Sequence, residues 1–241
     1  SGNGGGAIYG HNATVTIGDG VSITGNKTTG DNSGGGAIAL SGTSSLTVGK
    51  ATISNNSSQY GGGIASWSTG TVTLNGTIIK NNTALSTGNW GNGGGISVNK
   101  SGTLNVNGAT ITGNQSLFGG GIGAYDTAKV NIDIASSLNE KTTISNNTVT
   151  GTGGAGLYGY GDSVFNIGDG VQITQNHARG NDSGGGAIAL ANNATLIAGK
   201  AILDGNDAQY GGGIASWSTG TSQLNGTTIS NNQALSTTGW G

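Results

Sequence analysis

The sequence predicts an all-β protein, a parallel β-helix of about eight coils with three sheets. Three observations predict this fold class: a long internal repeat, two short motifs that each recur eight times at intervals near 30 residues, and short runs in which apolar and polar residues alternate. A coil of three short strands cannot bury its apolar side chains alone, so coils of this kind must stack along an axis.

Composition excludes several other classes. The chain has 241 residues, of which 52 are Gly and none is Pro, Cys or Met, and 8 basic against 10 acidic residues give a net charge of −2. Without cysteine there is no disulfide framework or thiolate metal site, and the few Lys and Arg form no basic patch for nucleic acid. No apolar run is long enough to span a membrane. No signal segment opens the chain, so we expect a mature or excised piece.

The long repeat has a period of 150 residues. Positions 33–40 are identical to positions 183–190, and positions 60–71 are identical to positions 210–221, at the same offset. We therefore expect a single β-helix domain, 1–241, in which 1–150 is one copy of a tandem unit and 151–241 is a partial second copy.

The first strand of each coil is predicted where a glycine run is followed by an aliphatic residue. These residues are Ile8, Ile38, Ile64, Ile96, Ile122, Leu157, Ile188 and Ile214. Stacked coils would place them in one interior ladder, because each strand pairs with its copies above and below.

The second strand is predicted from alternating runs such as 14–17 and 71–74, in which one side is buried and the other exposed. Its interior ladder comprises Val15, Leu46, Val72, Leu104, Val130, Phe165 and Leu196. The third strand carries an aliphatic residue followed three positions later by Asn. The aliphatic members are Ile23, Ile53, Ile79, Ile111, Ile144, Ile173, Leu203 and Ile229.

Glycine and asparagine are predicted to have backbone roles. Three glycines before Ile64 or Ile96 allow positive φ and a tight corner without a Cβ. The final Asn of each third strand, such as Asn56, is expected to adopt the left-handed conformation and to hydrogen-bond its neighbours along the stack. A phosphate-binding role for the glycines would need a following helix, and no helix is predicted.

The glycine–alanine–aliphatic element at 5–8, 35–38 and 185–188, followed by the x-x-Asn motif, resembles the repeats of polymorphic outer-membrane proteins and related autotransporter adhesins. In that family the second element is Phe-x-x-Asn, whereas here Ile or Leu replaces Phe throughout. The resemblance implies a secreted, surface-exposed stalk or passenger whose usual activity is adhesion. With the general prevalence of right-handed crossovers, it also implies a right-handed helix.

Enzymatic activity is not expected. Polysaccharide-processing β-helices need two or three carboxylates that converge on one sheet surface. Asp19 and Asp169 are five coils apart, roughly 24 Å at ~4.8 Å per coil. Asp204 and Asp207 are close in sequence but flank a predicted turn.

Histidine and metal chemistry are not expected either. His11 and His177 fall in unlike turns and are predicted to be solvated, without an acid partner. No calcium-binding nonapeptide occurs, and one acid in a turn such as 18–20 is a weak calcium site. We therefore expect no metal and no other cofactor.

Aromatic residues are the candidate ligand-binding groups. Trp67 and Trp217 follow Ser66 and Ser216, which are predicted to point inward, so the indole rings should point outward. Exposed rings beside Asn, Ser and Thr suit a sugar, whereas the alternative is that the rings hold loops against the solenoid wall. The candidates are Tyr60, Trp67, Trp90, Tyr210, Trp217 and Trp240.

The predicted function is that of a non-enzymatic extracellular repeat module: a stalk, adhesin passenger or filament subunit of a microbial surface protein. Expected partners are host or matrix glycans, together with further repeats or other copies stacked head to tail. A carbohydrate-binding or polysaccharide-processing β-helix is the alternative. A third hypothesis is ice binding by outward Thr pairs such as Thr14 and Thr16, although ordinary strand propensity also explains them.

Overall fold

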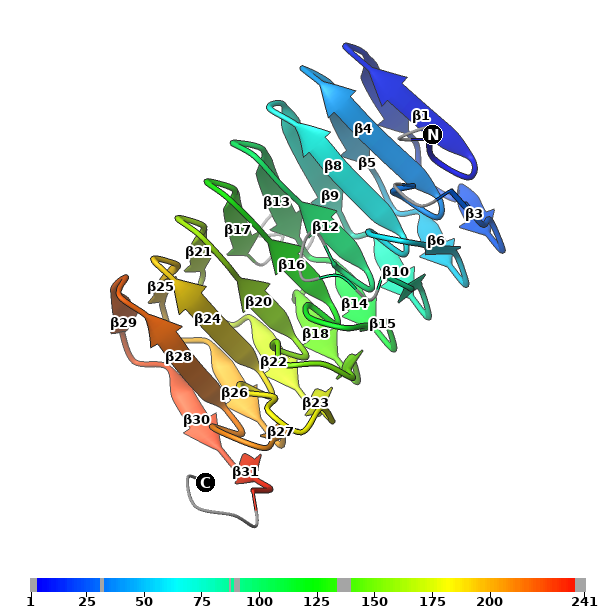
Figure 1. Cartoon of the computed structure of the whole chain (residues 1–241). Coiled ribbons are helices and arrows are strands. Elements are labelled where there is room, and N and C mark those ends of the chain that lie inside the picture. Colours follow the sequence, from blue (N-terminus) through cyan, green and yellow to red (C-terminus); the bar gives the residue numbers. More distant parts are fainter. Residues whose placement is uncertain (1–3, 31–32, 87, 89–91, 134–139, 237–241) are drawn as a thin grey trace.

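The chain folds into a parallel β-solenoid, as expected (Figure 1). The computed structural model describes residues 4–30, 33–86, 88, 92–133 and 140–236. Within these residues all regular structure is strand, and the chain passes eight times through three sheets and seven times through a fourth. Every strand pair is parallel, which places each coil directly beside the next.

Four sheets run along the solenoid, and they are named A to D here. Sheet A contains β1 (Ile8–His11), β4 (Ile38–Gly42), β8 (Ile64–Ser68), β12 (Ile96–Val98), β16 (Ile122–Ala124), β20 (Leu157–Gly159), β24 (Ile188–Asn192) and β28 (Ile214–Ser218). Sheet B contains β2 (Thr14–Ile17), β5 (Ser45–Val48), β9 (Thr71–Asn75), β13 (Thr103–Asn107), β17 (Lys129–Asp133), β21 (Val164–Ile167), β25 (Thr195–Ala198) and β29 (Ser222–Leu224).

Sheets C and D have shorter strands. Sheet C contains β3 (Ser22–Thr24), β6 (Thr52–Ser54), β10 (Ile78–Lys80), β14 (Thr110–Thr112), β18 (Thr143–Ser145), β22 (Gln172–Thr174), β26 (Ile202–Asp204) and β30 (Thr228–Ser230). Sheet D contains β7 (Ser57–Ser58), β11 (Thr83–Ala84), β15 (Gln115–Ser116), β19 (Thr148–Val149), β23 (His177–Ala178), β27 (Asp207–Ala208) and β31 (Gln233–Ala234).

Sheet D corrects the prediction of three sheets. Its strands are two residues long, so they carry no alternating pattern that a sequence can reveal. In the first coil this sheet is reduced to an isolated bridge between Lys27 and Ser57.

The registers of the three predicted ladders are confirmed, and the ladders are buried except at their ends, where Ile8, Val15 and Ile214 are partly buried and Ile229 is 46% exposed. Ile38 pairs with Ile64, Leu46 with Val72, and Ile53 with Ile79, and the same registers continue from coil to coil. These side chains belong to one continuous apolar core that runs through the stack. Such burial is the main favourable term in folding, and it requires every coil to keep the register of its neighbours.

Core volume is balanced between facing sheets. Phe165 is the one aromatic residue in the sheet B ladder, and it is fully buried. Opposite it, sheet A presents Gly159 at a position that holds Leu190 in the next coil. A Cβ on Gly159 would lie 2.8 Å from Cε2 of Phe165. The glycine therefore makes room for the larger ring.

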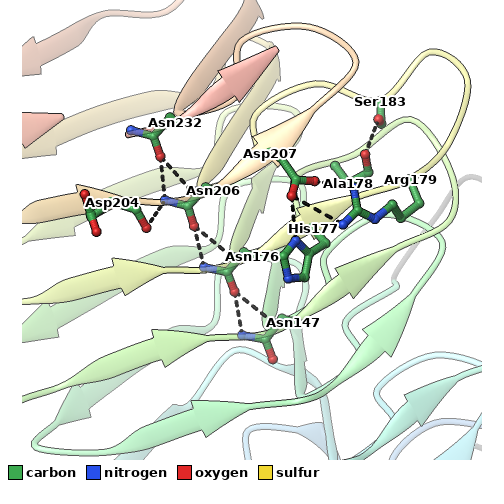
Figure 2. Close-up of polar contacts among 10 residues, drawn as sticks. All are labelled: Asn147, Asn176, His177, Ala178, Arg179, Ser183, Asp204, Asn206, Asp207 and Asn232. Carbon is green, nitrogen blue, oxygen red and sulfur yellow. Dashed lines mark hydrogen bonds and ion pairs between the residues drawn. The ribbon is translucent and has the colours of Figure 1, made fainter. Parts of the chain in front are cut away.

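The asparagines after sheet C form a hydrogen-bonded ladder, as predicted, and all but its two end members are buried (Figure 2). In each step the backbone N–H and the Nδ2 of one Asn donate to the Oδ1 of the next, at 2.8–3.1 Å. The members are Asn26, Asn56, Asn82, Asn114, Asn147, Asn176, Asn206 and Asn232.

The conformation predicted for these asparagines was wrong by one residue. The left-handed φ falls on the residue before each ladder Asn, for example Asn55 at 56° and Gly113 at 64°. That residue makes the turn, which directs the ladder side chain into the solenoid wall rather than toward solvent. Because Asn, Gly and Gln share this position, the ladder Asn is fixed by its hydrogen bonds and not by its φ.

The glycine corners are required mainly because there is no space for a side chain. Gly35 has a φ of 64°, and a Cβ there would lie 1.8 Å from the carbonyl oxygen of Ile38. At Gly61 and Gly93, before Ile64 and Ile96, φ lies outside the left-handed region, contrary to the prediction. A Cβ would still lie 2.0 and 1.8 Å from the following carbonyl oxygens. Steric exclusion is therefore common to all three corners.

Candidate functional site

Among the described residues, most aromatic side chains that point away from the core lie on the outer face of sheet A. Ser66 pairs in register with Leu40 and Val98 on the inner side and is buried. Trp67, the next residue, therefore points outward, as predicted, and Trp217 occupies the same position in the last coil. We call this row of outward positions the outer row. It contains His11, Ser41, Trp67, Asn99, Tyr125, Tyr160, Ala191 and Trp217.

Trp67 is half-buried and packs on its own loop. Its ring meets Tyr60 edge to face, with the ring centroids 5.8 Å apart at an interplanar angle of 83°. The ring also lies over Gly34 in the preceding coil, where a Cβ would come within 1.8 Å of Cη2. Two predicted site residues, Tyr60 and Trp67, are thus brought together.

Trp217 and Tyr210 line an open cleft of about 400 Å³. Trp217 is 52% exposed, whereas Tyr158 in the same cleft is 7% exposed. The complete lining is Thr152, Tyr158, Asp182, Ala191, Tyr210 and Trp217. Ala191 and Trp217 come from adjacent strands β24 and β28, and Tyr158 comes from β20. The other three lie on connections between coils.

The polar groups of this cleft are free to bind a ligand. The hydroxyls of Tyr158 and Tyr210, the Trp217 indole N–H and the Asp182 carboxylate make no hydrogen bond to the part of the chain that the structure describes. Burial, and to a lesser degree the neighbouring Tyr160, raises the pKa of Tyr158 well above its usual range. A tyrosine hydroxyl is protonated at neutral pH, so Tyr158 offers a donor at the cleft.

A second aromatic cluster on this face was not predicted. Tyr158 stacks on Phe118 with ring centroids 5.6 Å apart, and it contacts Tyr125 at 5.9 Å and Tyr160 at 6.4 Å. The buried Tyr125 hydroxyl donates to the carbonyl of Asn92 at 2.7 Å and accepts from its N–H at 3.0 Å. Tyr125 thus holds a loop on the solenoid wall. Positions 117–125 occur in only one copy of the 150-residue unit, so the repeat did not single them out.

Two predicted site residues, Trp90 and Trp240, lie outside the described residues. Of the six candidates, the structure therefore places Tyr60 with Trp67, and Tyr210 with Trp217. The two pairs lie at separate places on the outer face of sheet A.

His177 has an acid partner, which corrects the prediction of an unpaired turn histidine. Its Nδ1 lies 2.7 Å from Oδ2 of Asp207 in the next coil, and Arg179 donates to the same carboxylate at 2.6 and 3.3 Å (Figure 2). The two strands are adjacent in sheet D, which the sequence did not reveal. The nearby hydroxyl of Ser183 is buried and donates to the carbonyl of Ala178 at 2.8 Å.

Three further carboxylates, those of Asp19, Asp169 and Asp204, have local structural partners. Asp19 and Asp169 occupy equivalent turns and accept from the backbone N–H groups of Lys50 and Lys200 at 2.7 and 2.8 Å. Asp204 accepts from the side chains of Ser230 and Asn231, and these hydrogen bonds lower its pKa. Within the described ranges, no group of three or more His, Cys, Asp or Glu is placed to hold a metal ion.

The outward Thr positions of sheet B are aligned over the first coils. Thr16, Thr47 and Thr73 pair in register, and Asn105 continues the same column. From there the column becomes an exterior Asn ladder, in which Asn131 donates to Asn105 and Asn166 donates to Asn131.

No protein-family model, curated protein or solved structure matches this chain. Across the described segments, no helix is long and apolar enough to cross a membrane.

Proposed function

We propose that this chain is a non-enzymatic, extracellular adhesive repeat module that binds carbohydrate on the outer face of sheet A. The cleft at Trp217 carries this proposal, because an exposed indole ring, the rings of Tyr210 and Tyr158, and unpaired polar groups line the same space. The adhesin-like glycine–alanine and x-x-Asn repeats support a location at a microbial surface.

The chemistry of the cleft suits a sugar. Pyranose rings present C–H faces that stack on aromatic rings, while their hydroxyls need donors and acceptors at the rim. Trp217 and Tyr210 provide the rings; Tyr158 and Asp182 provide a donor and an acceptor. A cleft of about 400 Å³ is within the usual size of small-ligand sites, roughly 300–1,000 Å³.

A binding role fits the cleft better than hydrolysis. Asp182 is the one acid among the residues that line it. Glycoside hydrolysis uses a pair of carboxyl groups that flank the scissile bond. The aligned Thr16, Thr47 and Thr73 keep ice binding as a second candidate function, and thermal hysteresis of a freezing solution is its direct test.

The proposal is tested by presenting the chain to an array of neutral and acidic glycans. We expect binding that is lost in the double variant Trp67→Ala/Trp217→Ala, with the far-ultraviolet circular dichroism unchanged. Ile197→Ala is the matched control, because Ile197 is 41% exposed on the outer side of sheet B, away from the cleft. A wild-type chain that binds no glycan would refute the proposed function.

A further inference from the structure

The two outer-row tryptophans are placed in the same way. A Cβ on Gly34 would lie 1.8 Å from Cη2 of Trp67, and a Cβ on Gly184 would lie 2.0 Å from Cη2 of Trp217. Neither glycine has a φ in the left-handed region, so an alanine is compatible with the backbone at both positions. The atoms nearest to such a Cβ belong to the indole ring, and the next is the Cβ of Ala65 or Ala215, at 2.9 Å in each case. The tryptophan ring therefore lies over the equivalent glycine of the preceding coil in both cases.

The neighbours of the two tryptophans also correspond. Tyr60 and Tyr210 each precede the glycine corner of the coil that carries the tryptophan. Tyr9 lies two coils before Trp67, and Tyr158 lies two coils before Trp217. Both tyrosines occupy the same column of sheet A, so the two pairs are related in the same way. Tyr9 is 50% exposed. Each aromatic residue of the Trp217 cleft thus has a counterpart near Trp67.

The two sets of residues differ in their small polar members. Where the Trp217 cleft has Ala191, the equivalent position is Ser41, whose hydroxyl lies 3.0 Å from that of Tyr9 and 2.9 Å from Nδ1 of His11. The set around Trp67 therefore presents a hydrogen-bonded polar rim beside the same aromatic frame. We call the two sets the Trp67 site (Tyr9, Ser41, Tyr60, Trp67) and the Trp217 site (Tyr158, Ala191, Tyr210, Trp217).

Both sites lie on one face at a fixed separation. Trp67 is in β8 and Trp217 is in β28, five coils further along sheet A (Figure 1). At ~4.8 Å per strand this separation is about 24 Å along the axis. Between them the outer row continues through Asn99, Tyr125 and Tyr160, and Tyr125 is buried. The sites are therefore separate, and a ligand that occupies both must pass over the coils between them, where Tyr125 is buried.

We propose that the chain is a bivalent receptor for one extended, neutral polysaccharide that lies along the solenoid axis and occupies both sites. This inference rests on the proposed carbohydrate-binding function. Two like sites about 24 Å apart on one face suit a polymer that presents the same sugar unit at both places, whereas a short sugar fills each site independently. No Lys or Arg lines the Trp217 cleft, and Asp182 does, so an acidic polymer is disfavoured.

Bivalency predicts a large effect of ligand length. Once one site is occupied, the second binding event is intramolecular, and avidity can exceed the single-site affinity by about 10²–10⁴-fold without new contacts. The probes are soluble neutral polysaccharides (β-glucan, xylan, mannan and galactan) and short oligosaccharides cut from each. Calorimetry gives the stoichiometry and the Kd for wild type, Trp67→Ala, Trp217→Ala and the double variant.

The expected results separate this inference from the function on which it rests. A short oligosaccharide should bind wild type at two sites and each single variant at one site, with little change in Kd. The long polymer should lose about 10²–10⁴-fold in affinity in either single variant. Wild-type binding at one site only, or equal affinity for short and long ligands, overturns bivalency while the carbohydrate function stands. If no probe binds, the function itself fails.

A second pair of variants tests the placement of the rings without removing them. Gly184→Ala should displace the Trp217 ring and weaken polymer binding as Trp217→Ala does, and Gly34→Ala should act equally on Trp67. Gly18→Ala is the matched control, because a Cβ there meets no atom within 4 Å and its φ is outside the left-handed region. Unchanged polymer binding in both Gly34→Ala and Gly184→Ala would contradict the proposed sites.

Discussion

Replacing Asn114 by Ala tests the buried asparagine ladder where it is fully enclosed. The Asn114 side chain is inaccessible to solvent and makes four hydrogen bonds. Its Oδ1 accepts from the backbone N–H and the Nδ2 of Asn82, both at 3.0 Å. Its Nδ2 donates to the carbonyl of Ile79 at 3.1 Å and to Oδ1 of Asn147 at 3.0 Å. Alanine removes all four.

The cost follows from these bonds and from the groups left behind. A hydrogen bond contributes a net ~1 kcal/mol, and a buried donor left without a partner costs about 1–3 kcal/mol. Asn82 keeps its bond to the carbonyl of Ile53, and Asn147 still accepts from the Asn114 backbone, so part of the network survives. Four lost hydrogen bonds at ~1 kcal/mol each give an expected loss of about 4 kcal/mol in the free energy of unfolding. This is a large share of a typical unfolding free energy of about 5–15 kcal/mol.

The assay is guanidinium unfolding followed by circular dichroism, with hydrogen exchange to localise the effect. Neighbouring coils unfold with partial independence in a solenoid, so the Asn82 amide should exchange faster than amides in distant coils. Asn131→Ala is the control, because Asn131 makes two side-chain bonds in the half-exposed ladder of sheet B. The reasoning is refuted if Asn114→Ala costs no more than Asn131→Ala.

Three further predictions concern pH and association. Burial raises the folded pKa values of Tyr125 and Tyr158 above the unfolded one. Above pH ~10 the free energy of unfolding should therefore fall by about 1.4 kcal/mol per pH unit for each of them. Tyr158→Phe should flatten this slope when unfolding is measured as a function of pH. Hydrogen bonds lower the folded pKa of Asp204, so its stabilisation is present above the unfolded pKa of about 3.9 and is lost as pH falls through the folded value. Asp204→Ala should therefore reduce the loss of unfolding free energy per pH unit in acid. Between about pH 5 and 9 the stability of wild type should stay nearly flat. At one end of the described ladder the Nδ2 of Asn232 donates one hydrogen to the carbonyl of Leu203, and its second N–H has no acceptor among the described residues. At the other end the Oδ1 of Asn26 accepts no hydrogen bond from the described residues. We therefore expect the 241-residue chain to associate head to tail, and light scattering that shows a monomer at all concentrations would contradict this.

Most of the fold was accessible from the sequence because the ladders repeat. Ile53 and Ile79, for example, were matched by spacing alone, and the structure pairs them. The fourth sheet was missed because strands such as Gln115–Ser116 are too short to show a period. The left-handed position was assigned to Asn56 instead of Asn55 because two adjacent asparagines give the same local signal.

The candidate site was predicted only in part. The outward direction of Trp67 and Trp217 followed from strand alternation, but the walls of the Trp217 cleft did not. Tyr158 lies in a strand two coils away, and Asp182 lies on a connecting loop, so their convergence depends on stacking and loop path. Pairing of His177 with Asp207 was missed for the same reason, since 30 residues of chain separate them.

The variable coil length explains why the site lies on the outer face of sheet A. Successive first-strand aliphatic residues are 26 to 35 residues apart, yet the ladders stay in register. The extra residues must therefore lie outside the strands. Between sheet D and sheet A the connection is short after β7, from Ser58 to Ile64, and longer after β23, from Ala178 to Ile188. The longer connection carries Asp182 to the cleft. A constant core thus leaves these connections free to vary, and their chemistry can change without disturbing a buried ladder.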